Sequence, residues 1–420
     1  MPEEFIDWTE GSWRMSPQTQ ESPSLLFCAD WAPVRALERG VLDSPGSLYS
    51  EAIRAELKRS NRRVVNVETT LQRIPGKLPQ EVKEGPSFCA PATAVNDLLS
   101  AGFDIALLAN NHMGDYGAAG LVETREILVE AGLQTCGTGT SQEDAYAACV
   151  IDVEGHSVAL VNFHEGEEGA HTERNPALAG WDLARVHREI ARQKAAGHRV
   201  VALPHSDREF FPVPAPYGQR AYRSLVDAGA DIVIGHHPHV PRGVEIYKGA
   251  PIIYSQGNFL FWSGQPGLMR RLGYMVRLHL LPDGKLAFRL LPYRITPEGL
   301  RRLEGAERQW LFSQLESVSG EALTPESVQA YWHAAMDALS EDEWLSDATG
   351  MAYTFKCMRE RHPQGIARLR TRLLCPAHHH FMTEGISRVL EGKHGTSPPE
   401  LIEKFRLWTG TAEGPIPVNR

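Results

Sequence analysis

The chain has 420 residues, of which 42% are hydrophobic and 23% charged, with a net charge of −9 and a pI near 6.0. This length suits one large domain with an appendage, and the negative charge argues against a nucleic-acid partner. No run approaches the roughly 20 apolar residues of a membrane span, and the acidic N-terminus lacks a signal-peptide pattern. The six cysteines have no CxxC spacing, as is typical of reduced thiols. We therefore expect a cytoplasmic protein with no membrane partner and an unknown oligomeric state.

Apolar strands that end in polar residues recur along the chain after a flexible segment expected at residues 1–23. The strands and the polar residues at their ends are 24–30 with Asp30, 63–71 with Asn66 and Glu68, 103–109 with Asn110, Asn111 and His112, 198–205 with His205, and 231–235 with His236, His237 and His239. Such runs, rich in β-branched residues, are typical of strands buried on both faces.

Helices and hairpins are expected between and after these strands. Helical patterns cover 48–60, 92–101, 119–131, 181–197, 297–318, 325–340, 355–373 and 384–408, and hairpins cover 149–163 and 274–295. Thr324 is the expected N-cap of the helix that starts at Pro325. The change to helical periodicity predicts a helical C-terminal extension over residues 301–420. Its histidine run, 378–380, has no carboxylate beside it and is not expected to bind metal.

The loop after strand 231–235 contains three histidines within four residues. Pro238 fixes its own φ and is expected to keep His237 extended, so these histidines cannot lie on a helix. A βα-rich sandwich would bring all the strand ends to one rim. Oxygen ligands mixed with imidazoles suit Mn²⁺, Zn²⁺ or Fe, in a number sufficient for two ions. Glu68 could bridge them, because a carboxylate has two oxygens.

Several motifs together resemble one known family. ANNHMGDYG, GADIVIGHHPHV, VEIYKGAPIIYSQGNFLF and Asn66-Val67-Glu68 look like the CapA-like (capsule and poly-γ-glutamate synthesis) family of the calcineurin-like metallophosphoesterase superfamily. The similarity covers residues 24–300. It implies an α/β fold, a four-layered α/β/β/α metallophosphoesterase-like sandwich, with a dinuclear metal centre at one edge.

The resemblance also implies roles for individual residues. The implied metal ligands are Asp30, Glu68, Asn111, His205, His237 and His239. His112 corresponds to the acid that meets the substrate, and Glu209, which matches the family's glutamate after the strand-end histidine, is implied as a further catalytic residue. His236, Asn66 and Asn110 would support the ligands. The sequence departs from the superfamily pattern at Asp30-Trp31-Ala32, where the pattern has a histidine ligand and this chain has Ala32. Typical members look membrane-anchored, and no such anchor is expected from this sequence.

Three functions are compatible with these residues. The first is hydrolysis of a phosphoester at a metal pair, in which His112 protonates the leaving oxygen and Asp115 either orients its ring or is only a turn residue. The second is metal-assisted amide-bond or proton-transfer chemistry on a peptide or amino-acid substrate, with the His- and Glu-rich loop 163–175 facing that substrate or merely solvated. The third is a non-catalytic subunit of polymer synthesis that docks through its helical tail.

Overall fold

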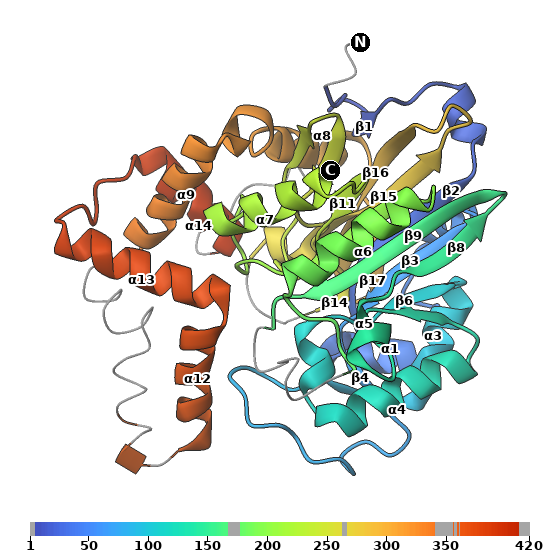
Figure 1. Cartoon of the computed structure of the whole chain (residues 1–420), viewed down its shortest axis with the longest axis horizontal. Helices are drawn as coiled ribbons and strands as arrows, with labels where there is room; N and C mark the ends of the chain where they lie inside the picture. The colour runs from blue at the N-terminus through green and yellow to red at the C-terminus, as the bar shows by residue number, and fades with distance from the viewer. Residues whose placement is uncertain are drawn as a thin grey trace.

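The computed structural model describes residues 5–166, 177–262, 267–340, 356, 359–360 and 362–410. Two β-sheets pack face to face, with helices on their outer faces, and the C-terminal helices extend to one side of this sandwich (Figure 1). The predicted four-layered α/β/β/α class with a helical C-terminal part is therefore confirmed. One continuous apolar core runs between the sheets and beneath the covering helices.

The larger sheet has nine strands and a parallel centre. Its order is β1-β16-β15-β2-β3-β6-β7, with β14 beside β2 and β17 beside β16. All nine residues of β2 are buried, as expected for an apolar strand covered on both faces. The strands are β1 (Ser12–Trp13), β2 (Ser24–Ala32), β3 (Arg62–Val67), β6 (Ile105–Leu107), β7 (Gln134–Cys136), β14 (Asn258–Phe261), β15 (Leu272–Leu280), β16 (Leu286–Thr296) and β17 (Gly299–Arg302).

The second sheet has six strands in the order β12-β13-β11-β10-β9-β8. Its β8 and β9 form the predicted hairpin, in which Glu154 and Gly155 both have positive φ. The strands are β8 (Cys149–Val153), β9 (His156–His164), β10 (Arg199–His205), β11 (Ile232–Ile234), β12 (Val244–Tyr247) and β13 (Ala250–Ile253). A separate two-stranded sheet consists of β4 (Thr70–Gln72) and β5 (Cys89–Pro91).

Helices cover both sheets. The helix α4 packs beside β7 of the larger sheet, and α6 and α7 cover the six-stranded sheet. The helices of the sandwich are α1 (Glu38–Asp43), α2 (Glu51–Lys58), α3 (Val95–Ala101), α4 (Gly117–Glu130), α5 (Gln142–Tyr146), α6 (Leu183–Ala195) and α7 (Pro216–Asp227). Short 3-10 turns are η1 (Gln18–Glu21), η2 (Arg35–Leu37), η3 (Ala92–Ala94), η4 (Asn111–Gly114), η6 (Met269–Arg271) and η7 (Gly320–Leu323).

Several segments differ from the sequence-based expectation. The helix expected over 384–408 is two helices in the structure, one ending at Leu390 and the next starting at Pro399, and the strand expected over 63–71 ends at Val67. Residues 12–13 lie within the expected flexible segment, yet β1 pairs with β16 because Trp13 is buried and stacks on Phe288 with ring centroids 5.8 Å apart. Residues 299–302 were expected to be helical but form β17 against β16. Gly299, the first residue of β17, has a φ of 117°, a conformation that would be strained in a residue with a β-carbon. The next residue, Leu300, is buried.

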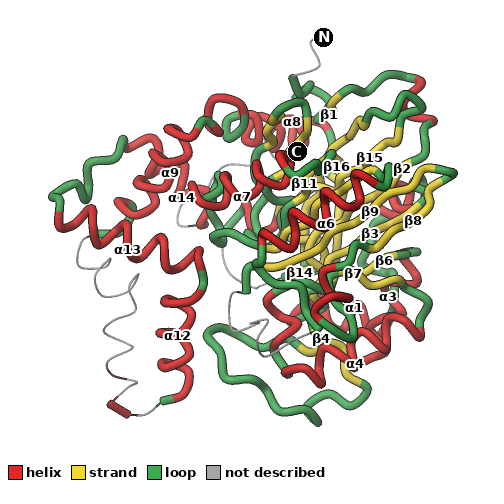
Figure 2. Tube along the Cα trace, viewed as in Figure 1, coloured by secondary structure: helices red, strands yellow, loops and turns green. Residues whose placement is uncertain are grey.

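The C-terminal helices are α8 (Gly305–Glu316), α9 (Pro325–Asp337), α12 (Pro363–Leu374), α13 (Pro376–Leu390) and α14 (Pro399–Thr409) (Figure 2). The predicted cap is present, since the Thr324 side chain accepts a hydrogen bond from the Ser327 amide at 3.2 Å. A second apolar cluster joins these helices to the loop after β10 through Phe211, Trp332 and Phe381. Trp408 of α14 is fully buried and donates to the Pro241 carbonyl at 3.0 Å.

Within the described ranges, no helix is long and apolar enough to span a membrane. The cysteines that the structure describes, Cys28, Cys89, Cys136, Cys149 and Cys375, all carry free thiols.

Replacing Trp332 by Ala is expected to lower the free energy of unfolding by about 3–5 kcal/mol, because the change leaves a cavity in the second apolar cluster. Urea denaturation followed by tryptophan fluorescence and circular dichroism would measure it. Leu390→Ala is the matched control, since Leu390 is 83% exposed and should change stability by less than about 0.5 kcal/mol. Equal effects of the two substitutions would contradict the packing described here.

Candidate metal centre

The site lies where the carboxyl ends of parallel strands from the two sheets meet. Asp30 of β2 pairs in register with Asn66 of β3, and Glu68 follows β3 directly. From the other sheet, His205 ends β10 and forms an isolated bridge with His236, which follows β11. All of these side chains are buried. The predicted meeting of strand ends at one rim therefore occurs, as the arrangement of open α/β sheets requires.

Three groups of side chains in the described residues could each hold a metal ion. They are Asp30, Glu68 and His239; Glu68, His205 and His237; and Glu209, His237 and His239. Within each group the ligand atoms all lie within 4.8 Å of one another. The structure thus brings together five of the six ligands implied by the sequence. The sixth, Asn111, lies beside them, with its Oδ1 2.9 Å from His205 Nε2.

Glu68 is the buried carboxylate shared by two of these groups. Neither of its oxygens accepts a hydrogen bond from the residues that the structure describes. Its Oε1 lies 3.5 Å from His205 Nε2 and 3.7 Å from His239 Nε2. Burial and the negative charge of Asp30 raise the pKa of Glu68 well above its usual value. A buried carboxylate with two unused oxygens beside several imidazoles fits a divalent cation, which would replace the missing donors.

Asp30 has more polar support than Glu68. Its Oδ1 accepts a hydrogen bond from Asn66 Nδ2 at 2.8 Å, and its Oδ2 lies 3.5 Å from His239 Nδ1. Burial opposes ionisation, but the nearby His239 ring and the hydrogen bond from Asn66 outweigh it and lower the pKa of Asp30. The two neighbouring carboxyls therefore have opposite pKa shifts, because their immediate partners differ.

His239 faces Glu68 and Glu209 through Nε2. Its Nδ1 lies 2.8 Å from Asn258 Oδ1, and this amide oxygen accepts the Nδ1 proton. Nε2 lies 3.6 Å from Glu209 Oε1, so Glu209, implied as catalytic, also belongs to the cluster. Burial lowers the pKa of His239, yet Glu68 and the other carboxylates raise it to about 10. The carboxylates that favour a proton on Nε2 would equally favour a metal ion there.

The backbone that carries the histidines is held in an uncommon conformation. His237 and His239 have φ values of 95° and 57°, and Asp207 and Phe210 of the neighbouring loop have 85° and 63°. The prediction that Pro238 keeps His237 in an extended conformation is therefore wrong, because the φ of His237 is positive. The surrounding contacts overcome the local preference: the Phe210 amide donates to the Pro238 carbonyl at 2.8 Å. Backbone strain of this kind gathers at functional sites.

His112 lies next to this cluster with its own set of partners. Its Nδ1 is 2.8 Å from Asp115 Oδ2, and its ring stacks on Phe88 with centroids 4.1 Å apart. Lys83 forms a buried ion pair with Asp115. Because an ionised carboxylate can only accept, Asp115 accepts from both Lys83 and His112 Nδ1, and Nε2 is the ring nitrogen of His112 that does not contact Asp115. Burial and the Lys83 charge lower the pKa of His112 to about 4, although Asp115 opposes this shift.

The supporting asparagines connect the ligands to one another. Asn66 Nδ2 lies 3.2 Å from His205 Nδ1 as well as bonding Asp30, and Asn110 Nδ2 donates to the Val67 carbonyl at 2.8 Å. His236, the other supporting residue, is buried beside His205, and burial lowers its pKa.

Two residues of the site were not found from the sequence. Lys83 lies in the loop between β4 and β5, where no periodicity or motif distinguishes it from a solvated lysine. Asn258 begins β14 and was visible only as part of the Ser255–Phe259 motif; its register partner in β2 is Asp30, which explains its closeness to His239. Of the loop 163–175, the part from residue 167 onward lies outside the described residues.

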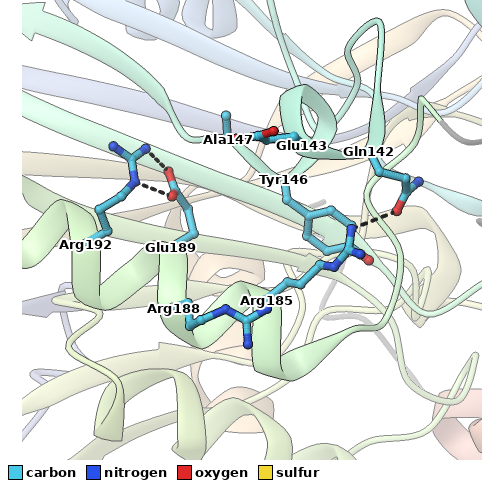
Figure 3. Close-up of a pocket in the computed structure, with 8 residues that line it drawn as sticks. All are labelled: Gln142, Glu143, Tyr146, Ala147, Arg185, Arg188, Glu189 and Arg192. Carbon is cyan, nitrogen blue, oxygen red and sulfur yellow. Dashed lines mark hydrogen bonds and ion pairs between the residues drawn. The ribbon is translucent and has the colours of Figure 1, made fainter.

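A separate surface pocket lies between α5 and α6 (Figure 3). Its lining residues are Gln142, Glu143, Tyr146, Ala147, Arg185, Arg188, Glu189 and Arg192, none of which belongs to the metal groups. Glu189 accepts two hydrogen bonds from Arg192, both at 2.7 Å, so part of the basic charge is neutralised locally.

The fold and the site define a protein of the metallophosphoesterase type, with histidines and carboxylates at the edge of a two-sheet sandwich. Residues 24–263 match the family described as bacterial capsule synthesis protein PGA_cap. The chain belongs to this family, and the resemblance to CapA-like proteins is confirmed.

Curated relatives carry related names. The chain is 31% identical over 225 residues to the capsule biosynthesis protein CapA of Bacillus anthracis, covering 51% of this chain and 54% of that protein. It is 32% identical over 205 residues to the PGA biosynthesis protein CapA of Bacillus subtilis, covering 48% and 53%. It is 28% identical over 281 residues to a probable polyglutamine synthesis accessory protein of Mycobacterium tuberculosis, covering 61% and 72%. The chain thus spans about half the length of the two Bacillus proteins.

In chelator-treated protein at neutral pH, Asp30→Asn is expected to cost about 1.5–3 kcal/mol of unfolding free energy, because it weakens charge-assisted contacts to Asn66 and His239. Glu68→Gln is expected to change stability by less than about 1 kcal/mol, since no hydrogen-bond donor is lost. Chemical denaturation of the two variants would measure the difference. A loss in Glu68→Gln as large as that in Asp30→Asn would show that Glu68 has stabilising partners in the folded chain.

Proposed function

We propose that this protein is a metal-dependent hydrolase of the metallophosphoesterase type, acting on a phosphoester in the synthesis of a capsule-type polymer. The observation that carries the proposal is Glu68, a fully buried carboxylate that lacks hydrogen-bond donors in the described chain and is shared by two groups of potential ligands. Burial of such a group costs several kcal/mol unless a cation compensates it. Selection for stability alone would not favour this arrangement.

Two divalent ions would share Glu68. One would lie among Asp30, Glu68 and His239, and the other among Glu68, His205 and His237, with Asn111 beside the second. Mixed oxygen and imidazole donors suit Mn²⁺, Zn²⁺ or Fe. When bound, such ions polarise a phosphoryl oxygen and make a nucleophile available from water at neutral pH. Glu209 is the partly exposed member of the cluster, so it faces the side from which a substrate would enter.

His112 is proposed to exchange a proton with the substrate through Nε2. Asp115 accepts the Nδ1 proton, which fixes both the ring orientation and the tautomer, and the ring stacks on Phe88. Lys83 holds Asp115 ionised, because burial alone would raise the pKa of that carboxyl, whereas the Lys83 charge and the hydrogen bonds from His112 and Lys83 lower it. In this neutral tautomer Nε2 carries no proton, so the proton that His112 gives to the leaving oxygen would first be taken up at Nε2 from the attacking water.

The place of this reaction in polymer synthesis is proposed from the names of the relatives. The two Bacillus proteins are named for capsule and PGA biosynthesis, and the mycobacterial protein for an accessory role in polyglutamine synthesis. The proposed substrate is accordingly a phosphorylated intermediate of such a pathway.

Wild-type protein loaded with Mn²⁺ is expected to retain about two ions per chain after desalting, as measured by elemental analysis. Glu68→Ala is expected to lose both, because both proposed sites use this residue. Glu143→Ala, which changes an exposed carboxylate outside the cluster, is the control and should retain them. Retention of two ions by Glu68→Ala would contradict the shared-ligand arrangement.

Replacing His112 by Asn is expected to lower kcat for an aryl phosphate by about 10²–10⁴ without loss of bound metal, because only the proton exchange is removed. Steady-state kinetics with and without Mn²⁺, together with metal analysis of the same sample, would test this. Release of glutamate from a γ-glutamyl amide, with no phosphate release from the aryl ester, would instead indicate amide chemistry and contradict the proposal.

A further inference from the structure

Glu165 is a buried carboxylate between the sandwich and the C-terminal helices. It follows β9, is 7% exposed, and its own amide donates to the carbonyl of His205 at 3.1 Å. It belongs to none of the metal-binding groups. Its two oxygens nevertheless contact two parts of the chain that lie far apart in sequence: the loop that follows His205, and the start of α13.

The first oxygen fixes the loop that carries Glu209. Glu165 Oε2 accepts a hydrogen bond from the Asp207 amide at 2.6 Å. Asp207 lies midway between His205 and Glu209 and has a φ of 85°, a conformation that its surroundings must maintain. Its own carboxylate accepts from the amide of Ala215 and from Arg242 Nη1, the latter at 2.6 Å.

The second oxygen holds a helix of the extension. Glu165 Oε1 accepts from the Ala377 amide at 2.9 Å and from the Tyr217 hydroxyl at 2.8 Å. Ala377 is the second residue of α13, so the carboxylate satisfies one of the amides that the first turn of a helix leaves unpaired. A negative charge at this end also interacts favourably with the helix dipole.

The same loop meets the extension at a second point. Phe211, two residues after Glu209, packs against Trp332 of α9 and Phe381 of α13, with ring centroids 5.4 and 5.6 Å apart. The loop is therefore held on one side by the sandwich and on the other by the C-terminal helices. Any displacement of α13 would be transmitted to the Asp207 backbone through Glu165.

We propose that Glu165 is a positioning residue through which the docked C-terminal extension sets the place of Glu209 and His205 in the metal centre. The extension is then part of the active centre's support rather than an independent appendage. This inference rests on the proposed function, because it assigns the extension a role at that same site. The carboxylate, with two acceptor oxygens, is needed because both the loop and the helix present amide donors.

Glu165→Gln tests this requirement with little change in shape. An amide keeps one acceptor oxygen and turns an NH₂ group toward either the Asp207 amide or the Ala377 amide, so one of the two contacts is lost. We expect the Kd for Mn²⁺ to rise by roughly 10-fold to 100-fold, the range seen when groups that support metal ligands are changed. Isothermal titration calorimetry on the full chain would measure it. Glu165→Ala should show the same direction.

Glu384→Ala is the matched control. Glu384 of α13 accepts from Trp332 Nε1 at 3.0 Å and contacts His333 Nε2 at 2.9 Å, so it joins α13 to α9 without touching the Asp207 loop. Its removal should lower the thermal midpoint but leave the Mn²⁺ affinity within about twofold of wild type. Thermal unfolding of all variants would identify any that fail to fold, and the Gln variant serves where Glu165→Ala does not fold.

The outcomes separate the inference from the proposed function. Weakened Mn²⁺ binding in the Glu165 variants, with unchanged binding in Glu384→Ala, would support the coupling. Wild-type affinity in folded Glu165→Gln would overturn the inference and leave the proposed function standing. Equal weakening in Glu384→Ala would also overturn it, since general loosening of the extension would then be sufficient. A wild-type chain that binds no Mn²⁺ would overturn the proposed function, and the inference with it.

Discussion

The arrangement of this site depends on the burial of Glu68 between two groups of imidazoles and carboxylates. Burial disfavours the ionised form of Glu68, and the negative charge of the neighbouring Asp30 disfavours it further, so the pKa of Glu68 is raised. The protein supplies hydrogen bonds to Asp30 and His239 but none, in the part of the chain described, to Glu68. Asp30 Oδ2 likewise has no donor among the described residues, so three buried carboxylate oxygens at this place could serve a partner with positive charge. The rest of the fold places nitrogen and oxygen ligands on both sides of them.

Both sheets are required to build this cluster. Asp30 and Glu68 come from the nine-stranded sheet, whereas His205 and the histidines after β11 come from the six-stranded sheet. The packing of the two apolar faces therefore determines the ligand distances, and the left-handed backbone at His237 and His239 is maintained by contacts between loops. Strain of this kind is tolerated because a large buried core supports it.

The sequence predicted which residues meet at the site better than it predicted the contacts that support them. Five of the implied ligands and Glu209 lie in the metal groups, since each follows an apolar strand whose end is recognisable from its pattern. Lys83, in contrast, approaches Asp115 from an irregular loop, and its burial depends on contacts that no local pattern encodes. Trp13 was likewise missed, because its surroundings in sequence are polar and its partner, Phe288, lies in the last hairpin. The strand β17 was mistaken for helix because pairing with β16 overrides a weak local preference.

By itself, the sequence determined the order of the main strands and helices, the α/β class and the residue types at the strand ends, because hydrophobic periodicity and turn residues are local properties. Only the tertiary structure decided which oxygens of the site remain without donors, how Asp115 orients His112, and that the C-terminal helices contact the loop between His205 and Glu209. These features depend on pairs of residues far apart in sequence, such as Glu165 with Ala377. The closeness of such pairs follows from the packing of the whole chain and not from any segment of it.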